Sequence, residues 1–126
     1  MSASSRRAQR SRATLFEELR GEQLSAVTFV QDYIQLWFDG PGINVINPLT
    51  VRIPGSTMTS WDPGFRDLLC GQIAKIVAKV EWRAEEALTI TFEDESALSI
   101  SLRKEHYCSA EAYYAHGFKD GAWLVE

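Results

Sequence analysis

From residue 88 the chain reads Leu88-Thr89-Ile90-Thr91-Phe92-Glu93-Asp94-Glu95-Ser96-Ala97-Leu98-Ser99-Ile100-Ser101-Leu102. Apolar and polar side chains alternate on both sides of the acidic segment 93–96. Successive side chains of a strand point to opposite faces, so this pattern predicts two antiparallel strands with one buried face. The stretch is therefore expected to form a β-hairpin.

This hairpin has a counterpart about fifty residues earlier in the chain. Residues 19–45 match residues 69–100 at positions that are apolar, glycine or turn-forming. A repeat of this kind constrains the fold, because both copies must bury equivalent positions, but it says little about chemistry. The expected core residues are Leu19, Leu36, Phe38, Leu69, Leu88, Ile90, Phe92, Leu98 and Ile100.

Three short helices are predicted, over residues 14–21, 62–71 and 109–117, because capping residues and glycines mark their ends. Thr14 and Glu17 have the spacing of a capping box, with Thr14 as the N-cap. Asp62 precedes Pro63, which suits the first position of a helix. All three helices are too short to be stable without tertiary packing.

Three strands are predicted after each of the first two helices, over residues 24–30, 34–38 and 43–46, and over residues 73–82, 88–92 and 98–102. A last short strand is predicted over residues 122–125. Segment 73–82 could also be helical, but Ile76, Val77 and Val80 favour a strand. The expected fold is an α+β domain with a tandem helix-β-β-β repeat, which forms one antiparallel sheet or a partial barrel. Segment 54–64, rich in turn formers, would link the copies.

Length and charge predict a single domain that follows a basic tail. Four of the 13 basic residues lie in the first twelve positions, which contain no acidic residue, so residues 1–12 are expected to be a disordered tail. Residues 13–126 would form the domain, with repeats at about 14–53 and 62–102. That domain keeps nine basic against 17 acidic residues. Such an acidic body repels nucleic acid and favours a basic protein partner, whereas the tail leaves contact with nucleic acid or anionic lipid open.

The sequence also indicates a compartment. No apolar run approaches the roughly 18–20 residues needed to span a bilayer, and the N-terminal segment lacks the apolar stretch of a secretory signal. We therefore expect a cytoplasmic protein without a membrane partner. Cys70 and Cys108 are expected to be reduced thiols, with Cys70 in the core.

A succession of short motifs adds a resemblance, and the motifs are Phe38-Asp39-Gly40, Pro63-Gly64-Phe65-Arg66-Asp67-x-Leu69-Cys70-Gly71 and Phe92-Glu93-Asp94. This succession resembles a group of small uncharacterised bacterial proteins, and some proteins of similar build are grouped with immunity proteins of toxin systems. The resemblance covers roughly residues 19–116 and implies no catalytic residues to carry over. At the second turn, Asp94-Glu95 stands where the pattern would favour Asp-Gly.

Residues 106–116 contain side chains that are found in metal sites and in catalytic sites. His106, Cys108 and His116 match no strong zinc-binding spacing, so no metal or other cofactor is expected. His106 and Cys108 would point to the same side of a strand, which leaves open a small hydrolase or transferase that uses this Cys/His pair. No orienting group or oxyanion hole is recognisable, so we expect no catalytic residue.

The first predicted hairpin carries Tyr33 and Trp37 on its polar face, where the second hairpin has threonine and serine. Tyrosine and tryptophan outside a core are typical of binding hot spots. Either this face is an interface or the helix at 109–117 covers it, and the sequence leaves both open. Acidic residues in predicted turns would steer a basic partner, and these are Glu85, Glu86, Glu93, Asp94 and Glu95.

The sequence therefore predicts a non-enzymatic protein that binds another macromolecule. Its most specific form is an immunity or antitoxin-like protein whose acidic surface blocks a basic protein. A structural subunit that forms a homodimer through the same aromatic face stays open as well.

Overall fold

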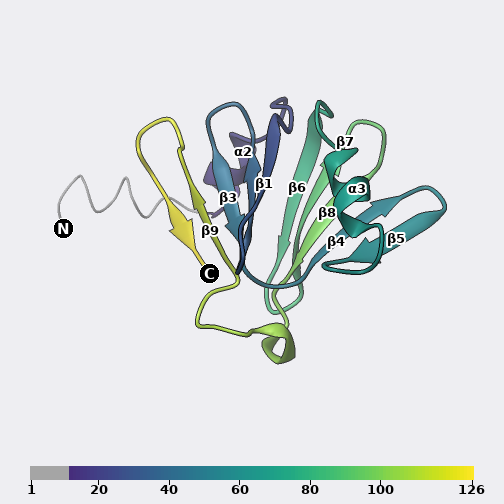
Figure 1. Ribbon diagram of the computed structural model, residues 1–126. Coiled ribbons are helices and arrows are strands. Elements are labelled where there is room, and N and C mark those ends of the chain that lie inside the picture. The colour runs from purple at the N-terminus through teal and green to yellow at the C-terminus, as the bar shows by residue number, and fades with distance from the viewer. Residues whose placement is uncertain (1–11) are drawn as a thin grey trace.

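The computed structural model describes residues 12–126 and places two antiparallel sheets around one hydrophobic core (Figure 1). The described chain is mostly β, with two short α-helices, which agrees with the expected α+β class in its coarse form. Its elements are α2 (Arg12–Glu17), β1 (Ala26–Phe29), β2 (Ile34–Trp37), β3 (Gly42–Val45), β4 (Leu49–Ile53), β5 (Ser56–Thr59), α3 (Phe65–Cys70), β6 (Val77–Arg83), β7 (Ala87–Phe92), β8 (Ala97–Ser101), the 3-10 turn η1 (Lys104–His106), β9 (Tyr113–His116) and β10 (Leu124–Val125).

The alternating stretch forms the hairpin that the sequence predicts. Leu88 pairs with Ile100 and Ile90 with Leu98, and all four side chains are buried. Thr89 and its partner Ser99 point to the opposite face, where their hydroxyls hydrogen-bond at 3.3 Å. All nine predicted core residues are buried, so the period-two pattern identified the inward face correctly.

Each sheet takes strands from both halves of the chain. The order of sheet one is β1-β2-β3-β9-β10, and the order of sheet two is β5-β4-β8-β7-β6. Thus the β4–β5 hairpin, early in the sequence, pairs with β8, and the late β9–β10 hairpin pairs with β3. The expected single sheet is therefore replaced by two, and the predicted linker 54–64 contains β5. Local sequence patterns do not indicate which strand, distant in sequence, a given strand will pair with.

The predicted third helix is wrong. Residues 109–112 form bends and irregular backbone, and the residues that follow form β9, which pairs with β3 along its whole length. Tyr113 and Ala115 are buried while Tyr114 and His116 are half-buried, the alternation of a strand. The helix-favouring composition of this segment was overridden by the cross-strand partners that β3 supplies.

The two remaining helices are present, with shifted starts. Helix α2 begins at Arg12, so Thr14 lies inside it and does not cap it, and the predicted tail is shorter by this one residue. Residues 1–11, the rest of the predicted tail, lie outside the described residues. In α3 the N-cap is Gly64, because the Asp62 carboxylate accepts instead from the Thr59 N–H at 2.9 Å.

Cys70 corrects another expectation, because it is exposed and not part of the core. Phe65 and Leu69, four residues apart, form the buried face of α3. The next residue along a helix points about 100° away from its neighbour, which turns Cys70 outward. The helix pattern was right, but the assignment of its last residue to the buried face was not.

The Glu126 carboxylate joins three elements at the edge of the core. Its Oε1 accepts from Tyr113 Oη at 2.8 Å, from Trp82 Nε1 at 2.8 Å and from Arg12 Nε at 3.2 Å. The Arg12 guanidinium also lies over the Trp82 ring, 4.6 Å from its centroid. Burial, followed by the bond to Glu126, raises the pKa of Tyr113 well above its usual value. The hydrogen bonds of Glu126 thus connect α2 and β6 to β9.

Within residues 12–126, no helix has both the length and the apolar character required to cross a bilayer.

Candidate functional site: an aromatic face, an acidic turn and a cleft

The structure divides the seven predicted interface residues between opposite ends of the two sheets. Strand β2 separates Tyr33 from Trp37, and β7 separates the turn with Glu85 and Glu86 from the turn with Glu93, Asp94 and Glu95. One end thus holds Trp37 with the 93–95 turn, and the other holds Tyr33 with the 85–86 turn. The five predicted acidic residues therefore lie in two separate turns, at opposite ends of sheet two.

A short chain of backbone hydrogen bonds places Trp37 and the 93–95 turn near each other. The Trp37 carbonyl accepts from Ser25 N–H at 2.7 Å, and the Leu24 carbonyl accepts from Ala74 N–H at 2.7 Å. The carbonyl of Ile76, two residues further on, accepts from Glu93 N–H at 2.9 Å. Trp37 therefore lies at the end of sheet one that joins sheet two at its acidic turn.

Trp37 belongs to an aromatic cluster on the outer face of sheet one, the face that points away from the core. Its ring meets the His116 ring edge to face at a centroid distance of 5.5 Å, and Tyr114 lies 5.2 Å from His116. The rings meet above Gly42, where a Cβ would lie 2.9 Å from His116 Cε1 and 3.0 Å from Trp37 Cε3. The missing side chain at Gly42 is thus what lets the two rings touch.

Hydrogen bonds hold the polar edge of this aromatic cluster. Asn44 Oδ1 accepts from Gln35 Nε2 at 3.3 Å and lies 3.3 Å from His116 Nε2. The Trp37 indole N–H donates to Thr28 Oγ1 at 3.3 Å. Burial lowers the pKa of His116, so the ring is favoured in its neutral form. The cluster is consequently a neutral aromatic surface with a few fixed polar groups.

The expected alternative, a helix over this face, does not hold within the described residues. The segment predicted to be that helix is a neighbouring strand of the same sheet and contributes Tyr114 and His116 to the cluster. Helix α2 packs against β6, and α3 packs against β1, β4 and β5. Trp37 is half-buried by its own strand neighbours.

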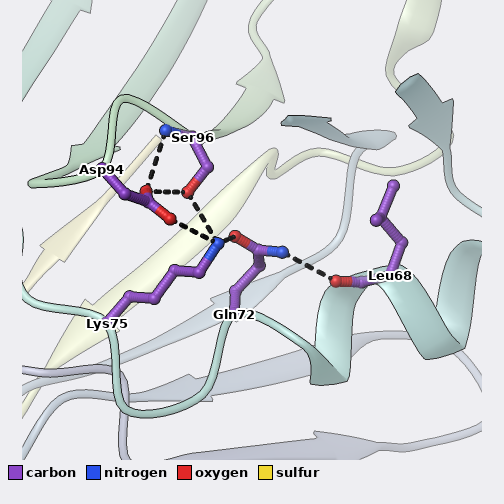
Figure 2. A network of polar contacts seen from close by, with 5 residues as sticks. All are labelled: Leu68, Gln72, Lys75, Asp94 and Ser96. Carbon is purple, nitrogen blue, oxygen red and sulfur yellow. Dashed lines mark hydrogen bonds and ion pairs between the residues drawn. The ribbon is translucent and has the colours of Figure 1, made fainter. Parts of the chain in front are cut away.

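Figure 2 shows that Asp94 is tied into a network at the 93–95 turn. Its Oδ2 lies 2.8 Å from Lys75 Nζ, and its Oδ1 accepts from Ser96 N–H at 3.0 Å and from Ser96 Oγ at 2.5 Å. Lys75 Nζ also donates to Gln72 Oε1, and Gln72 Nε2 donates to the Leu68 carbonyl in α3. The hydrogen bond from Lys75, followed by those from Ser96, lowers the pKa of Asp94 to about 2. Asp94 therefore connects the turn to α3 through Lys75 and Gln72, and the positive charge of Lys75 offsets the negative charge of Asp94.

Glu93 and Glu95 are exposed like Asp94, but they differ from it because no hydrogen bond or ion pair of their side chains is found among residues 12–126. Glu95 has a φ of 72°, in the left-handed region that glycine adopts without strain. The turn is closed by a hydrogen bond from Phe92 N–H to the Ser96 carbonyl at 2.8 Å. The turn therefore forms without a glycine, and Glu95 adopts the left-handed conformation that is unfavourable for a residue with a side chain.

At the opposite end, a cleft of about 290 Å³ brings together four segments that are distant in sequence. They are the β1–β2 turn, the β3–β4 connection, the turn after β5, and η1 with the loop that follows it. Tyr33 contributes to its lining, as do both His106 and Cys108. Trp61 also lines the cleft, and at 52% exposure it is the most exposed large apolar residue described. The sequence reasoning missed Trp61, although a tryptophan amid turn-forming residues was the available signal.

The cleft does not contain a recognisable catalytic triad among the described residues. His106 Nδ1 and Ser101 Oγ are 2.6 Å apart in a hydrogen bond, and Cys108 is an exposed free thiol. No group of three or more His, Cys, Asp or Glu residues between 12 and 126 is placed to hold a metal ion. Comparison of the chain with protein-family models, with curated proteins and with solved structures found no match.

Proposed function

We propose that this protein is a non-enzymatic, cytoplasmic binding protein that captures a basic protein partner, in the manner of an immunity or antitoxin-like protein. The observation that supports this role best is the aromatic cluster of Trp37, His116 and Tyr114, which contains Trp37 at the same end of the two sheets as the acidic turn 93–95. Aromatic side chains supply large contact area at low entropic cost, and exposed acids attract a basic surface before contact.

Within this proposal the residues have different tasks. Trp37 is the anchor, because truncation of a central tryptophan is typically among the most costly changes in an interface. Glu93 and Glu95 steer the partner, since their carboxylates are exposed and have no described side-chain partner. Asp94 maintains the shape of the turn, because its charge is offset by Lys75. Tyr33, Glu85 and Glu86 lie too far along the sheets to share this contact.

The test is capture of partners from native lysate with the full chain, its Trp37→Ala variant and its Glu93→Gln/Glu95→Gln double variant. A basic protein retained by the wild type should be lost with Trp37→Ala and should associate more slowly with the double variant. Salt should weaken capture, because exposed charges are screened within about 10 Å at 0.1 M ionic strength. Thr89→Ala, on the outer face of sheet two, is the matched control.

Thermal melts of all three variants accompany the capture experiment, so that loss of binding is not confused with loss of folding. Capture that is indifferent to salt and to Trp37→Ala would refute the proposal. A wild-type dimer that Trp37→Ala converts to monomer would instead identify the aromatic face as a homodimer contact.

A second candidate function, a small hydrolase or transferase, is favoured by one observation. His106 and Cys108 line the same cleft, which the sequence alone left open. A nucleophilic cysteine needs a thiolate, so Cys108 would react with an alkylating reagent unusually fast near neutral pH, and His106→Ala would slow that reaction. Alkylation of Cys108 at the rate of the exposed Cys70 would exclude this candidate.

We also propose that the scaffold arose from a tandem repeat. In chain order each half has a helix, three strands of one sheet and a hairpin that pairs with the other sheet. The halves meet where Gln23 and Ile76 form an antiparallel bridge. Phe38 and Phe92 hold matching positions before the β2–β3 and β7–β8 turns, and both are buried. Phe38→Ala and Phe92→Ala should each cost about 3–5 kcal/mol in urea unfolding. Costs that differ by several kcal/mol would speak against equivalent sites.

A further inference from the structure

The lining of the cleft near Trp61 is rich in aromatic and acceptor groups. The lining includes Asp32 together with the ring-bearing residues Tyr33, Trp61 and His106, and among residues 12–126 it includes neither lysine nor arginine. A volume of about 290 Å³ is at the lower end of ligand pockets and suits one small organic group. The negative charge of Asp32 and the aromatic rings of the lining therefore favour a cationic ligand over an anionic one.

The backbone holds Trp61 in an unfavourable conformation at the rim of this cleft. Its φ is 72°, a value that glycine tolerates and a bulky residue rarely adopts. The turn around it is closed twice, by Asp62 N–H on the Thr59 carbonyl at 3.0 Å and by Thr59 N–H on Asp62 Oδ2 at 2.9 Å. Strained residues that the surrounding structure enforces are frequent at binding sites. Here the strain keeps a large ring at the surface.

The aromatic group around Trp61 already holds one cation. The Arg66 guanidinium lies 5.3 Å from the Trp61 ring centroid and 5.7 Å from that of Phe29. Arg66 does not line the cleft, but lines a neighbouring depression that shares Trp61 with it. This contact has the distance of a cation–π pair, and it shows that a guanidinium packs against this indole.

The wall of the cleft also has an unpaired acceptor. Asn47 is 2% exposed, and its Nδ2 donates to the Ser101 carbonyl at 2.8 Å. Its Oδ1 is buried without a hydrogen-bond partner among the described residues. A buried acceptor without a donor is costly, so a donor that reached Asn47 Oδ1 would relieve this cost. A ligand with several N–H groups complements such a wall better than an anion does.

We infer that this cleft binds a small organic cation of the guanidinium class, with Trp61 and Tyr33 against its flat faces and Asp32 as its counter-ion. A guanidinium is planar, weakly hydrated and rich in donors, so it stacks on aromatic rings and pairs with carboxylates more readily than an ammonium. The same chemistry is offered by a free arginine-like compound and by an arginine side chain of a peptide. The cleft lies at the opposite end of the sheets from Trp37, so this inference does not depend on the proposed function.

The two cysteines provide the assay. Cys108 lines the cleft and Cys70 does not, and both thiols are exposed in the intact protein. N-acetyl-arginine amide should slow the alkylation of Cys108, measured by mass spectrometry, and leave the alkylation of Cys70 unchanged. N-acetyl-citrulline amide, a neutral analogue of similar shape, should protect neither. Equal protection of Cys108 by citrulline, or no protection by arginine, would overturn the inference.

Variants locate the site and exclude a general effect. Trp61→Gly removes the ring and suits the local backbone, so the variant should keep a cooperative melt while its affinity for the arginine probe falls about tenfold. Asp32→Asn should weaken the probe several-fold, and Trp123→Ala, which removes an exposed tryptophan outside the cleft, should leave its affinity unchanged. Wild-type affinity in folded Trp61→Gly would refute the site. Tighter binding of a capped Gly-Arg-Gly peptide than of the arginine amide would identify a peptide as the source of the cation. Equal binding of the two probes would identify a free compound as the source.

Discussion

Replacement of Asp94 by asparagine removes one negative charge from the 93–95 turn while it keeps the shape of the side chain. The asparagine Oδ1 can still accept from Ser96, so the change isolates the interaction with Lys75, whose Nζ lies 2.8 Å from Asp94 Oδ2. We expect the Asp94→Asn variant to be less stable than the wild type at neutral pH and equally stable in strong acid.

The magnitude follows from the pKa of Asp94, which is lowered from 3.8 to about 2, first by the Lys75 hydrogen bond and then by Ser96. A shift of this size corresponds to at most about 2.5 kcal/mol of stability. The Asp94 side chain is 52% exposed, so solvent screening reduces the contribution to about 1 kcal/mol. Because the folded-state pKa is the lower one, this stability is present above about pH 4 and is lost as the pH falls towards 2.

The assay is urea unfolding, followed by tryptophan fluorescence, of both proteins between pH 7 and pH 2.5. The difference in unfolding free energy should be about 1 kcal/mol at pH 7 and should shrink steadily below pH 4. Glu93→Gln is the matched control, since it removes a charge from the same turn where no described side chain pairs with it. A deficit that persists unchanged at pH 2.5, or equal deficits in both variants, would refute the reasoning.

Three further predictions concern single contacts. Glu95→Gly should raise the unfolding free energy by about 1 kcal/mol, because φ is 72° there, whereas Glu93→Gly should lower it; thermal melts check both. Glu126→Ala should cost about 2–3 kcal/mol in urea unfolding, since it leaves the buried Tyr113 hydroxyl without its acceptor, and Glu126→Gln should cost less. Gly42→Ala should cost about 1–3 kcal/mol in the same assay, because its Cβ would lie 2.9 Å from His116 Cε1.

The candidate sites were predictable only in part. Trp37 was identified because an aromatic residue stood where the second hairpin has small polar residues, and the structure leaves its face without a covering helix among the described residues. The role of Asp94 was not predictable, since its partner Lys75 lies in a different turn. Trp61 joins Tyr33 and His106 only because four loops converge at one end of the sheets.

By itself the sequence determined which residues face the core and where most of the strands lie. Leu88, Ile90 and Phe92 are buried because an alternating pattern can satisfy only one register without exposing its apolar side chains. The tertiary structure alone decided the partners of those strands. Tyr113–His116 is a strand because it pairs with the edge of β3, and β4 pairs with β8, whose partner residues lie about 50 positions later in the chain. Strands pair through backbone N–H and C=O groups, which nearly all residue types possess. The local sequence therefore hardly indicates which distant strand will be the partner.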